Sequence, residues 1–250
     1  MEIDGKCVVV TGGAKGLGFA ISTHLSALGA SVAILDRDRT ALETASEAIG
    51  NCLPIYCDVS QPQSVDKAVE QVMDNFNSLD VLINNAGIMK SSPLVNVSSK
   101  GDDRKHSQEL WKDVIDVNLN GTFFMTRSVA SAMLLKRTRG VIVNISSIAA
   151  QGNLGQTAYS AAKAGVEAMT VVWAKELGRF KVRCVAVAPG FMDTPGAKDA
   201  LNESIHAELK QRVPLGRLGS AQEVAAVVEQ IIANDFLNGC VISLDGGMRL

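Results

Sequence analysis

A glycine-rich turn near the beginning of the chain constrains the fold more than any other feature. It covers residues 12–18, Gly-Gly-Ala-Lys-Gly-Leu-Gly, between the apolar run Cys7–Val10 and a helix-like stretch from Leu17. A buried strand, a glycine turn and a helix N-terminus together cradle phosphate, because the helix dipole and the backbone N–H groups favour an anion. The spacing is G-x-x-x-G-x-G rather than G-x-G-x-x-G, so the turn alone equally fits an ordinary strand-to-helix connection.

Asp36 supplies the second half of a dinucleotide-binding pattern. It ends the apolar run Ser31–Leu35, roughly 20 residues past the glycines, where a carboxylate can accept hydrogen bonds from the adenosine ribose. The same carboxylate would repel a 2′-phosphate, which favours NAD over NADP. Lys15 and Arg37 favour NADP instead, since either cation could face a 2′-phosphate. We give more weight to Asp36, although a solvated charge at a strand end is also common.

Apolar runs alternate with helical patterns along the whole chain. The expected strands are Lys6–Thr11, Ser31–Asp36, Leu53–Cys57, Val81–Asn84, Val141–Ser146, Arg183–Val187 and Val241–Leu244. The expected helices are Leu17–Leu28, Thr40–Ala48, Gln61–Phe76, Gln108–Lys136, Thr157–Leu177 and Ala221–Ala233. Near-continuous Val/Ile runs are typical of strands buried on both faces of a parallel sheet. The pattern predicts an α/β fold: one domain over residues 1–250, doubly wound in the Rossmann manner, with a seven-stranded parallel sheet flanked by helices.

Local signals refine this expectation at two kinds of position. Ser60 with Gln63, and Ser220 with Glu223, predict capping boxes at helix starts. The polar segment 91–106 and the Pro-Gly-initiated segment 189–204 follow strand ends, where ligands bind in open parallel sheets. We therefore expect these two segments to be substrate loops, with one short helix in the second.

Composition excludes several classes of function. The 250 residues carry a net charge of −2 and no basic stripe, so we expect no nucleic-acid partner. No window approaches the roughly 18 apolar residues that span a membrane, and the first residues lack a signal-peptide layout. The five cysteines and three histidines show no ligand spacing, so we expect reduced thiols, no catalytic metal and a cytoplasmic location.

Tyr159 and Lys163 carry the candidate chemistry. They lie four residues apart on an expected helix, which places them on one face. A phenol ionises near pH ~10, and a neighbouring ammonium is expected to lower that pKa. The pair could therefore exchange a proton with a carbonyl or an alcohol. Ser146 and Ser147 end a preceding strand, and a serine hydroxyl there could polarise the substrate oxygen.

A series of short motifs occurs in a fixed order along the chain. They are residues 11–18, Asp36, Asp58-Val59, Asn84-Asn85-Ala86-Gly87, Asn118, Asn144–Ser147, Tyr159–Lys163 and Pro189-Gly190. Together they resemble the short-chain dehydrogenase/reductase family over essentially the full length of the chain.

The resemblance implies a role for each matching residue. Tyr159 exchanges a proton with the substrate oxygen, and Lys163 lowers its pKa and binds the nicotinamide ribose. Asn118 holds a water that links Lys163 to solvent, and a serine orients the carbonyl. The implied cofactor-binding residues are Gly12, Lys15, Gly16, Leu17, Gly18, Asp36, Asp58, Val59, Asn85, Ala86, Gly87, Tyr159, Lys163, Pro189, Gly190 and Thr194.

The identity of the orienting serine depends on a one-residue count. The family usually places it thirteen residues before the tyrosine, which gives Ser146, but the count from Asn144 gives Ser147. Successive residues of a strand point to opposite faces, so only one of the two can face the substrate. We choose Ser147, because strands tolerate deletions less well than loops do.

The helix that carries Tyr159 is apolar nearly all round, which predicts burial on two sides. One side should meet the sheet and the other a second subunit, and the resemblance implies a homodimer or homotetramer.

The substrate is less sharply defined by the sequence. Residues 236–246 are similar to type 2 3-hydroxyacyl-CoA dehydrogenases, whereas residues 152–159 are equally similar to 3-oxoacyl-acyl-carrier-protein reductases. We expect an oxidoreductase that transfers hydride between NAD(H) and a secondary alcohol or ketone, with a 3-hydroxyacyl thioester as the leading substrate. The alternatives are an NADPH-dependent oxoacyl or general carbonyl reductase and, in another class, a non-catalytic nucleotide-binding scaffold.

Overall fold

One sheet of seven parallel strands forms the centre of the molecule. The computed structural model describes residues 1–98, 104–194 and 203–250, with the backbone alone for residues 203–207. The sheet has the order β3-β2-β1-β4-β5-β6-β9. Its strands are β1 (Cys7–Thr11), β2 (Ser31–Asp36), β3 (Cys52–Tyr56), β4 (Val81–Asn84), β5 (Val141–Ile145), β6 (Arg183–Pro189) and β9 (Val241–Leu244).

Alternation along each strand builds two hydrophobic cores, one on each face of the sheet. In β1, Val8 and Val10 face one core, while Cys7 and Val9 face the other. All four of these side chains are buried. Because both faces need apolar residues, the strands appear in the sequence as unbroken apolar runs.

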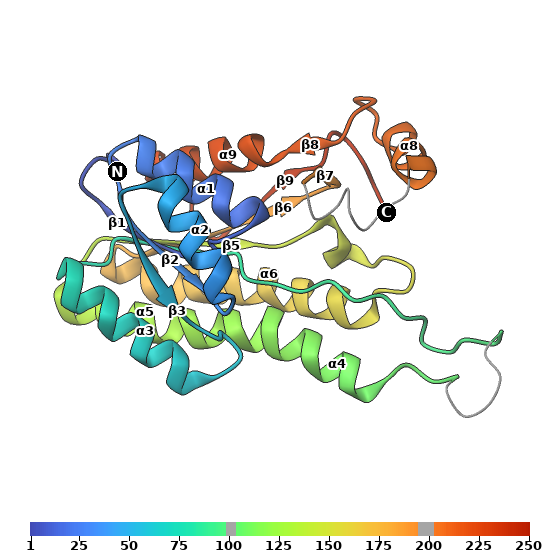
Figure 1. The fold of residues 1–250 in the computed structure, drawn as a ribbon, viewed down its shortest axis with the longest axis horizontal. Helices are drawn as coiled ribbons and strands as arrows, with labels where there is room; N and C mark the ends of the chain where they lie inside the picture. Colours follow the sequence, from blue (N-terminus) through green and yellow to red (C-terminus); the bar gives the residue numbers. More distant parts are fainter. Residues whose placement is uncertain (99–103, 195–202) are drawn as a thin grey trace.

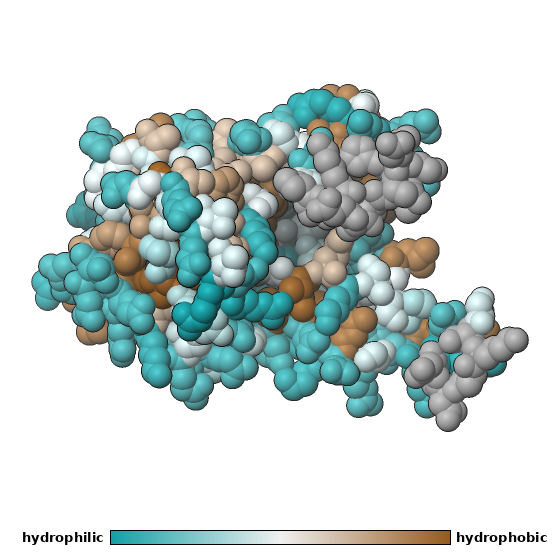
Figure 2. Space-filling model, viewed as in Figure 1, coloured by the Kyte–Doolittle hydropathy of each residue, from teal (hydrophilic) through white to brown (hydrophobic). Residues whose placement is uncertain are grey.

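Helices cover both faces of the sheet (Figure 1). The first layer contains α1 (Gly16–Ala27), α2 (Arg39–Ile49) and α9 (Ala221–Ala233). The second contains α3 (Pro62–Phe76), α4 (Gln108–Ile115), α5 (Gly121–Lys136) and α6 (Thr157–Leu177). α3 buries Val65 and Val72 and leaves a hydrophilic outer face, visible at the lower left of Figure 2.

The strand order places a ligand crevice beside β1. The chain builds β1, β2 and β3 toward one edge, then crosses back to place β4 on the other side of β1. The loops after β1 and β4 therefore diverge and leave a crevice at their carboxyl ends. The glycine turn at residues 12–18 and the segment Asn85–Gly87 are these two loops.

The expected fold class is confirmed, with every expected strand present and its ends within two residues of the expected ones. Helices α6 and α9 begin and end at the expected residues. The hydrophobic pattern of the sequence located these elements well, because buried parallel strands and long amphipathic or apolar helices have distinct periodicities.

The expected continuous helix Gln108–Lys136 is wrong in its middle. A π-helical segment, η1 (Asp116–Asn120), separates α4 from α5. Within it, the Asn118 amide Nδ2 donates to the carbonyl oxygens of Val114 and Ile88, both at 2.9 Å. The side chain thus takes up a main-chain carbonyl of its own helix. A side-chain amide bonded to the helix backbone is a recognised cause of such irregularities.

One of the two expected capping boxes is confirmed. Ser220 Oγ accepts from the Glu223 N–H at 3.2 Å, and Glu223 Oε2 accepts from the Ser220 N–H at 2.8 Å. The box at Ser60 is wrong, because α3 begins after Gln61. Ser60 instead donates both its N–H and its hydroxyl to Asp58 Oδ1.

The two expected substrate loops lie partly outside the described residues, at 99–103 and 195–202. In the first, Asn96 and Leu94 hydrogen-bond across to Arg104 and His106, forming a pair of antiparallel arms. The second contains β7 (Met192–Asp193), which pairs with β8 (Gly219–Ser220), and leads into α8 (Glu203–Arg212). The small β7/β8 pairing was not expected.

Candidate active site

The glycine turn forms an open cradle at the carboxyl end of β1. Gly12 and Gly16 adopt φ values of +60° and +55°, which side chains with a Cβ rarely tolerate. α1 begins at Gly16, and no side chain in the described part of the protein caps it. The N–H groups of its first turn therefore lack helical partners and are oriented toward an incoming anion.

Gly18 packs beneath the turn, whereas Gly12 and Gly16 line the cleft. A Cβ on Gly18 would overlap the Gly12 carbonyl oxygen and lie 2.5 Å from Asn85 Nδ2. Gly18 is buried and does not line the cleft described below. Its part is to let α1 pack closely against the turn, rather than to touch a ligand.

Asn85 and Thr11 hold the two loops of the crevice together. Asn85 Nδ2 donates to the carbonyl oxygens of Thr11 and Gly12 at 2.9 and 3.1 Å. Thr11 Oγ1 accepts from the N–H groups of Asn85 and Ala86, both at 3.0 Å. These hydrogen bonds hold the loop after β4 against the loop after β1. Thr11 belongs to the motif at residues 11–18, but its hydrogen bonds to the loop after β4 were not predicted, because it simply ends an apolar strand in the sequence.

A long cleft of about 790 Å³ runs from the end of β2 across the glycine turn to the end of β4. It is lined by the following residues from the expected set: Gly12, Lys15, Gly16, Leu17, Asp36, Asp58, Val59, Asn85, Ala86, Gly87 and Thr194. Three lining residues from α2, Thr44, Ala45 and Ala48, were missed. No local motif marks them, since only the packing of α2 on the sheet brings its face to the cleft.

Asp36 lies half-buried at the β2 end of this cleft. Its Oδ1 accepts from the main-chain N–H of Asp38 at 3.1 Å, and no partner for Oδ2 occurs within the described ranges. Asp38 Oδ2 in turn accepts from Lys15 Nζ at 2.6 Å. That hydrogen bond raises the pKa of the Lys15 ammonium and lowers the pKa of the Asp38 carboxyl.

An inner pocket of about 250 Å³ adjoins the long cleft. The two share the lining residues Leu17, Asn85, Gly87, Ile88 and Thr194. The inner pocket also receives Asn118, Ser146, Ser147, Tyr159, Lys163, Pro189 and Gly190. The structure thus brings together all the expected catalytic residues, and it joins them to the cleft of the expected cofactor residues.

Lys163 is fully enclosed at the base of the inner pocket. Its Nζ donates to the Ile145 carbonyl oxygen at 2.7 Å and lies 5.6 Å from the centroid of the Tyr159 ring. Burial lowers the pKa of Lys163 to about 8, because the charged ammonium loses its hydration. The group is therefore close to half-protonated just above neutral pH.

The ionisation of Tyr159 differs from the expectation. Burial raises the pKa of Tyr159, and the hydrogen bond to the Ser147 hydroxyl offsets that rise only in part. The net direction is thus opposite to the expected lowering, because burial of the phenol outweighs the contribution that lowers its pKa. Tyr159 is thus a neutral phenol at physiological pH, able to donate a proton.

The adjacent serines lie just beyond the end of β5 and have different partners. Ser147 is hydrogen-bonded to Tyr159, and its Oγ also accepts from the Ala149 N–H at 3.1 Å. Ser146 Oγ donates to Glu167 Oε1 at 2.8 Å, one helical turn beyond Lys163. Contrary to the expectation that only one serine could face the substrate, both line the inner pocket, because they lie beyond the end of β5; Ser147 is the one in contact with the phenol.

Asn118 is buried between α4, α5 and the loop after β4. Its Nδ2 donates to two carbonyl oxygens, whereas its Oδ1 has no hydrogen-bond partner in the described part of the chain. A Cβ on Gly87 would come within 2.6 Å of that oxygen, so the glycine is needed for the close approach. An unpaired buried acceptor of this kind is a position where a water would gain a hydrogen bond.

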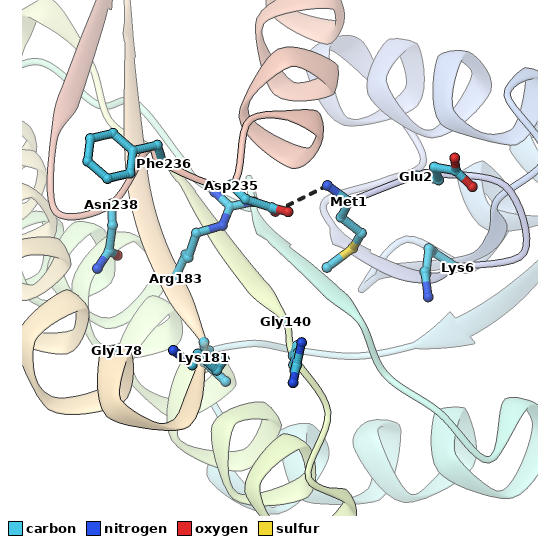
Figure 3. A pocket seen from close by; sticks show the side chains of 12 residues that line it. Met1, Glu2, Lys6, Gly140, Gly178, Lys181, Arg183, Asp235, Phe236 and Asn238 are labelled. Carbon is cyan, nitrogen blue, oxygen red and sulfur yellow. Dashed lines mark hydrogen bonds and ion pairs between the residues drawn. The ribbon is translucent and has the colours of Figure 1, made fainter.

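A separate cavity of about 720 Å³ lies at the opposite, amino end of the strands (Figure 3). Arg183 donates there to the carbonyl oxygens of Leu237 and Ile232, and Asp235 pairs with the Met1 amino group at 3.1 Å. These groups tie β6 to the end of α9 and to the start of the chain. None of the expected site residues lines this cavity.

Comparisons with known proteins agree with this fold. The family model described as short chain dehydrogenase matches residues 6–204. The chain is 39% identical to human 3-hydroxyacyl-CoA dehydrogenase type-2, over 100% of this chain and 97% of that protein. It is 37% identical to a 3-oxoacyl-acyl-carrier-protein reductase of Thermotoga maritima, over 99% of each. The crystal structure of a short-chain type dehydrogenase/reductase from Mycobacterium marinum superposes with a TM-score of 0.90 at 26% identity, covering 98% of this chain and 96% of that one.

The fold and the site define a nicotinamide-dinucleotide oxidoreductase that acts on CH–OH groups of small molecules. The chain belongs to the short-chain dehydrogenase family. The expectation of an enzyme, rather than a non-catalytic scaffold, is therefore confirmed. Within the described residues, no helix is long and apolar enough to cross a bilayer.

Proposed function

We propose that this enzyme is NAD(H)-dependent and interconverts a secondary alcohol and a ketone, with a 3-hydroxyacyl thioester as its substrate class. The observation that carries the cofactor choice is Asp36, whose carboxylate lines the cleft and keeps Oδ2 without a protein partner among the described residues. A free carboxylate oxygen can accept hydrogen bonds from the ribose hydroxyls. It also opposes a 2′-phosphate at the same place.

The cradle fits a dinucleotide pyrophosphate for reasons of space as well as charge. Gly16 has no atoms within 4 Å of a Cβ position, so the turn is open toward the cleft. The uncapped first turn of α1 supplies N–H donors to an anion. In this proposal the main chain of Gly12, Lys15, Gly16 and Leu17 holds the phosphates, with Gly18 supporting the turn from below.

The remaining expected cofactor residues extend the binding surface along the cleft. Asp58 and Val59 flank the adenine, and Asn85, Ala86 and Gly87 flank the nicotinamide half. Pro189, Gly190 and Thr194 close the site from the loop after β6. A bound nicotinamide dinucleotide supplies the hydride chemistry, and the protein supplies position and proton transfer.

The residues of the inner pocket handle the proton on the substrate oxygen. Tyr159, a neutral phenol, donates its proton to the carbonyl oxygen during reduction and recovers it during alcohol oxidation. Ser147 holds the same oxygen from its position beside the phenol. Lys163 and a water bound at the unpaired Asn118 Oδ1 return the proton from solvent.

The substrate class rests on the two kinds of named relative. Both names describe acyl chains that carry oxygen at carbon 3 on a carrier, and the two relatives span essentially the whole chain. The segments 91–106 and 189–204 are proposed to bind the acyl chain and its carrier, and Pro189, Gly190 and Thr194 of the second segment line the inner pocket. A cytoplasmic location and a homo-oligomeric state also remain proposals.

Titration of the protein with NADH and NADPH, followed by fluorescence, tests the cofactor choice. We expect NADH to bind at least about tenfold more tightly, a difference of about 1.4 kcal/mol. Asp36→Asn, which keeps the shape and removes the charge, should reduce this ratio. Equal or tighter binding of NADPH by the unmodified protein would support the NADPH-dependent reductase instead.

A substrate panel then tests the chemistry. We expect turnover with 3-oxoacyl-CoA thioesters to exceed turnover with aryl ketones and steroids of similar size. Activity confined to ketones without a thioester would remove the acyl assignment and leave the cofactor assignment intact.

A further inference from the structure

We infer that Asp38 is a second determinant of cofactor selectivity, because it holds the ammonium of Lys15 and so withholds a cation from a 2′-phosphate. This inference rests on the proposed dinucleotide site. It resolves the conflict between Asp36, which favours NAD, and Lys15, which lies inside the phosphate turn and by charge alone favours NADP.

The Lys15 side chain lies at the junction of the phosphate turn and the adenosine end of the cleft. The residue lines the cleft and immediately precedes α1. Its Nζ nevertheless reaches across to Asp38 Oδ2 at 2.6 Å, 23 residues along the chain. To meet a phosphate instead, the ammonium would first have to give up this charge-assisted hydrogen bond.

Asp38 is fixed in place by two further interactions. Its Oδ1 accepts from the Ala41 N–H at 3.0 Å and so caps α2. Its own main-chain N–H donates to Asp36 Oδ1 at 3.1 Å. The carboxylate that holds Lys15 is therefore anchored to a helix start and to the ribose-facing aspartate. A carboxylate held in one position discriminates between NAD and NADP better than a mobile one does. A mobile surface side chain loses most of its electrostatic interaction energy to conformational entropy and to solvent.

Two other cations near this end of the cleft can be compared with Lys15. Arg39 stacks over the Tyr56 ring, with Cζ 4.2 Å from the centroid. Arg37 is exposed, lines the cleft and makes no interaction with the described residues. Loss of the Asp38 charge therefore leaves the Lys15 ammonium without its carboxylate partner.

The direct test is Asp38→Asn. Asparagine caps helices about as well as aspartate, so α2 should keep its N-terminus while the Lys15 ammonium loses its carboxylate partner. We expect the Kd for NADPH to fall about fivefold or more at low salt, with NADH affinity changed less than about twofold. The gain should shrink as the salt concentration rises, because both groups are largely exposed.

Two double variants identify the cation responsible. In Asp38→Asn/Lys15→Met the NADPH gain should disappear, whereas in Asp38→Asn/Arg37→Gln it should persist. The inference is overturned if Asp38→Asn leaves NADPH affinity unchanged, or if the gain survives without Lys15 and is lost without Arg37. Circular dichroism melting of each variant shows that the comparison is made on folded protein.

The same titrations separate this inference from the proposed function. If the unmodified protein binds neither dinucleotide, the cofactor site itself is wrong. If it binds NADH preferentially and Asp38→Asn keeps the same NADH-to-NADPH ratio, the site stands and only the role of Asp38 is lost.

Discussion

At the scale of one residue, Lys163 lies in the candidate active site, and the burial of its ammonium there lowers the stability of the fold. Its ammonium is buried beside the Ile145 carbonyl, and burial lowers the pKa of Lys163 from 10.5 to about 8. The unfolded chain therefore binds this proton more tightly than the folded protein does. The cost of burying the charge is complete below pH 8 and disappears above the unfolded pKa.

Comparison with Lys163→Met tests this assignment. Between pH 8 and 10.5 the free energy of unfolding of the unmodified protein should rise relative to the variant, by roughly 3 kcal/mol over the whole interval. Urea denaturation at pH 7, 8, 9 and 10 measures the difference. A difference that does not change with pH would mean that Lys163 is not desolvated in the fold.

Ser147 and Ser146 provide a matched pair of substitutions at adjacent positions. Ser147→Ala should lower kcat about a hundredfold or more, because it removes a donor to the substrate oxygen. Ser146→Ala removes the hydrogen bond to Glu167 and should cost about 1 kcal/mol of stability with a much smaller change in kcat. Steady-state kinetics and thermal melts of both variants decide, and the reverse pattern would assign the orienting role to Ser146.

At the scale of elements, sequence periodicity located the strands and helices but not the departures from regularity. The π-helical segment at Asp116–Asn120 carries Asn118, whose amide bonds both to Val114 in the preceding helix and to Ile88 in the loop after β4. An apolar period cannot show such a contact. The misplaced capping box at Ser60 has a local cause, since the carboxylate of Asp58, two residues earlier, accepts the serine hydroxyl.

The candidate site was predictable to the extent that its residues belong to contiguous motifs. The turn at residues 12–18 and the pair Tyr159 and Lys163 carry their spacing in the chain itself. The cleft-facing residues of α2 and the pairing of Lys15 with Asp38 arise only when β2 and α1 are packed side by side. The raised pKa of Tyr159 likewise depends on burial, which a four-residue spacing does not reveal.

The close packing of α1 on the glycine turn gives a prediction at this scale. Gly18→Ala should weaken NADH binding about tenfold or more and lower the unfolding free energy by about 1–3 kcal/mol, because the added methyl overlaps the Gly12 carbonyl. Gly178→Ala is the control, since its nearest neighbour would be at an ordinary 3.6 Å. Equal effects of the two substitutions on NADH binding would show that the turn does not need this close contact.

At the scale of the whole molecule, the layer of α4, α5 and α6 presents apolar side chains to solvent. Trp111, Phe123 and Val172 are 41%, 42% and 49% exposed, one on each of these helices. Such residues are typical anchors of protein interfaces. They support the proposal that this layer meets a second copy of the chain.

Sedimentation velocity tests the proposed assembly. The unmodified protein should sediment as a dimer or tetramer, and Phe123→Glu should raise the dissociation constant about thirtyfold, the effect of losing an anchor worth about 2 kcal/mol. Leu28→Glu, at the end of α1 in the opposite helical layer, should leave the assembly unchanged. A monomer in the unmodified protein would contradict the proposal.

The central claim is that Tyr159 transfers the proton to the substrate oxygen beside a bound dinucleotide, and single-turnover reduction by Tyr159→Phe tests it most directly. With NADH saturating and the best 3-oxoacyl thioester of the panel, we predict that the rate of NADH oxidation falls about a thousandfold. Retention of the unmodified rate by Tyr159→Phe would contradict the account.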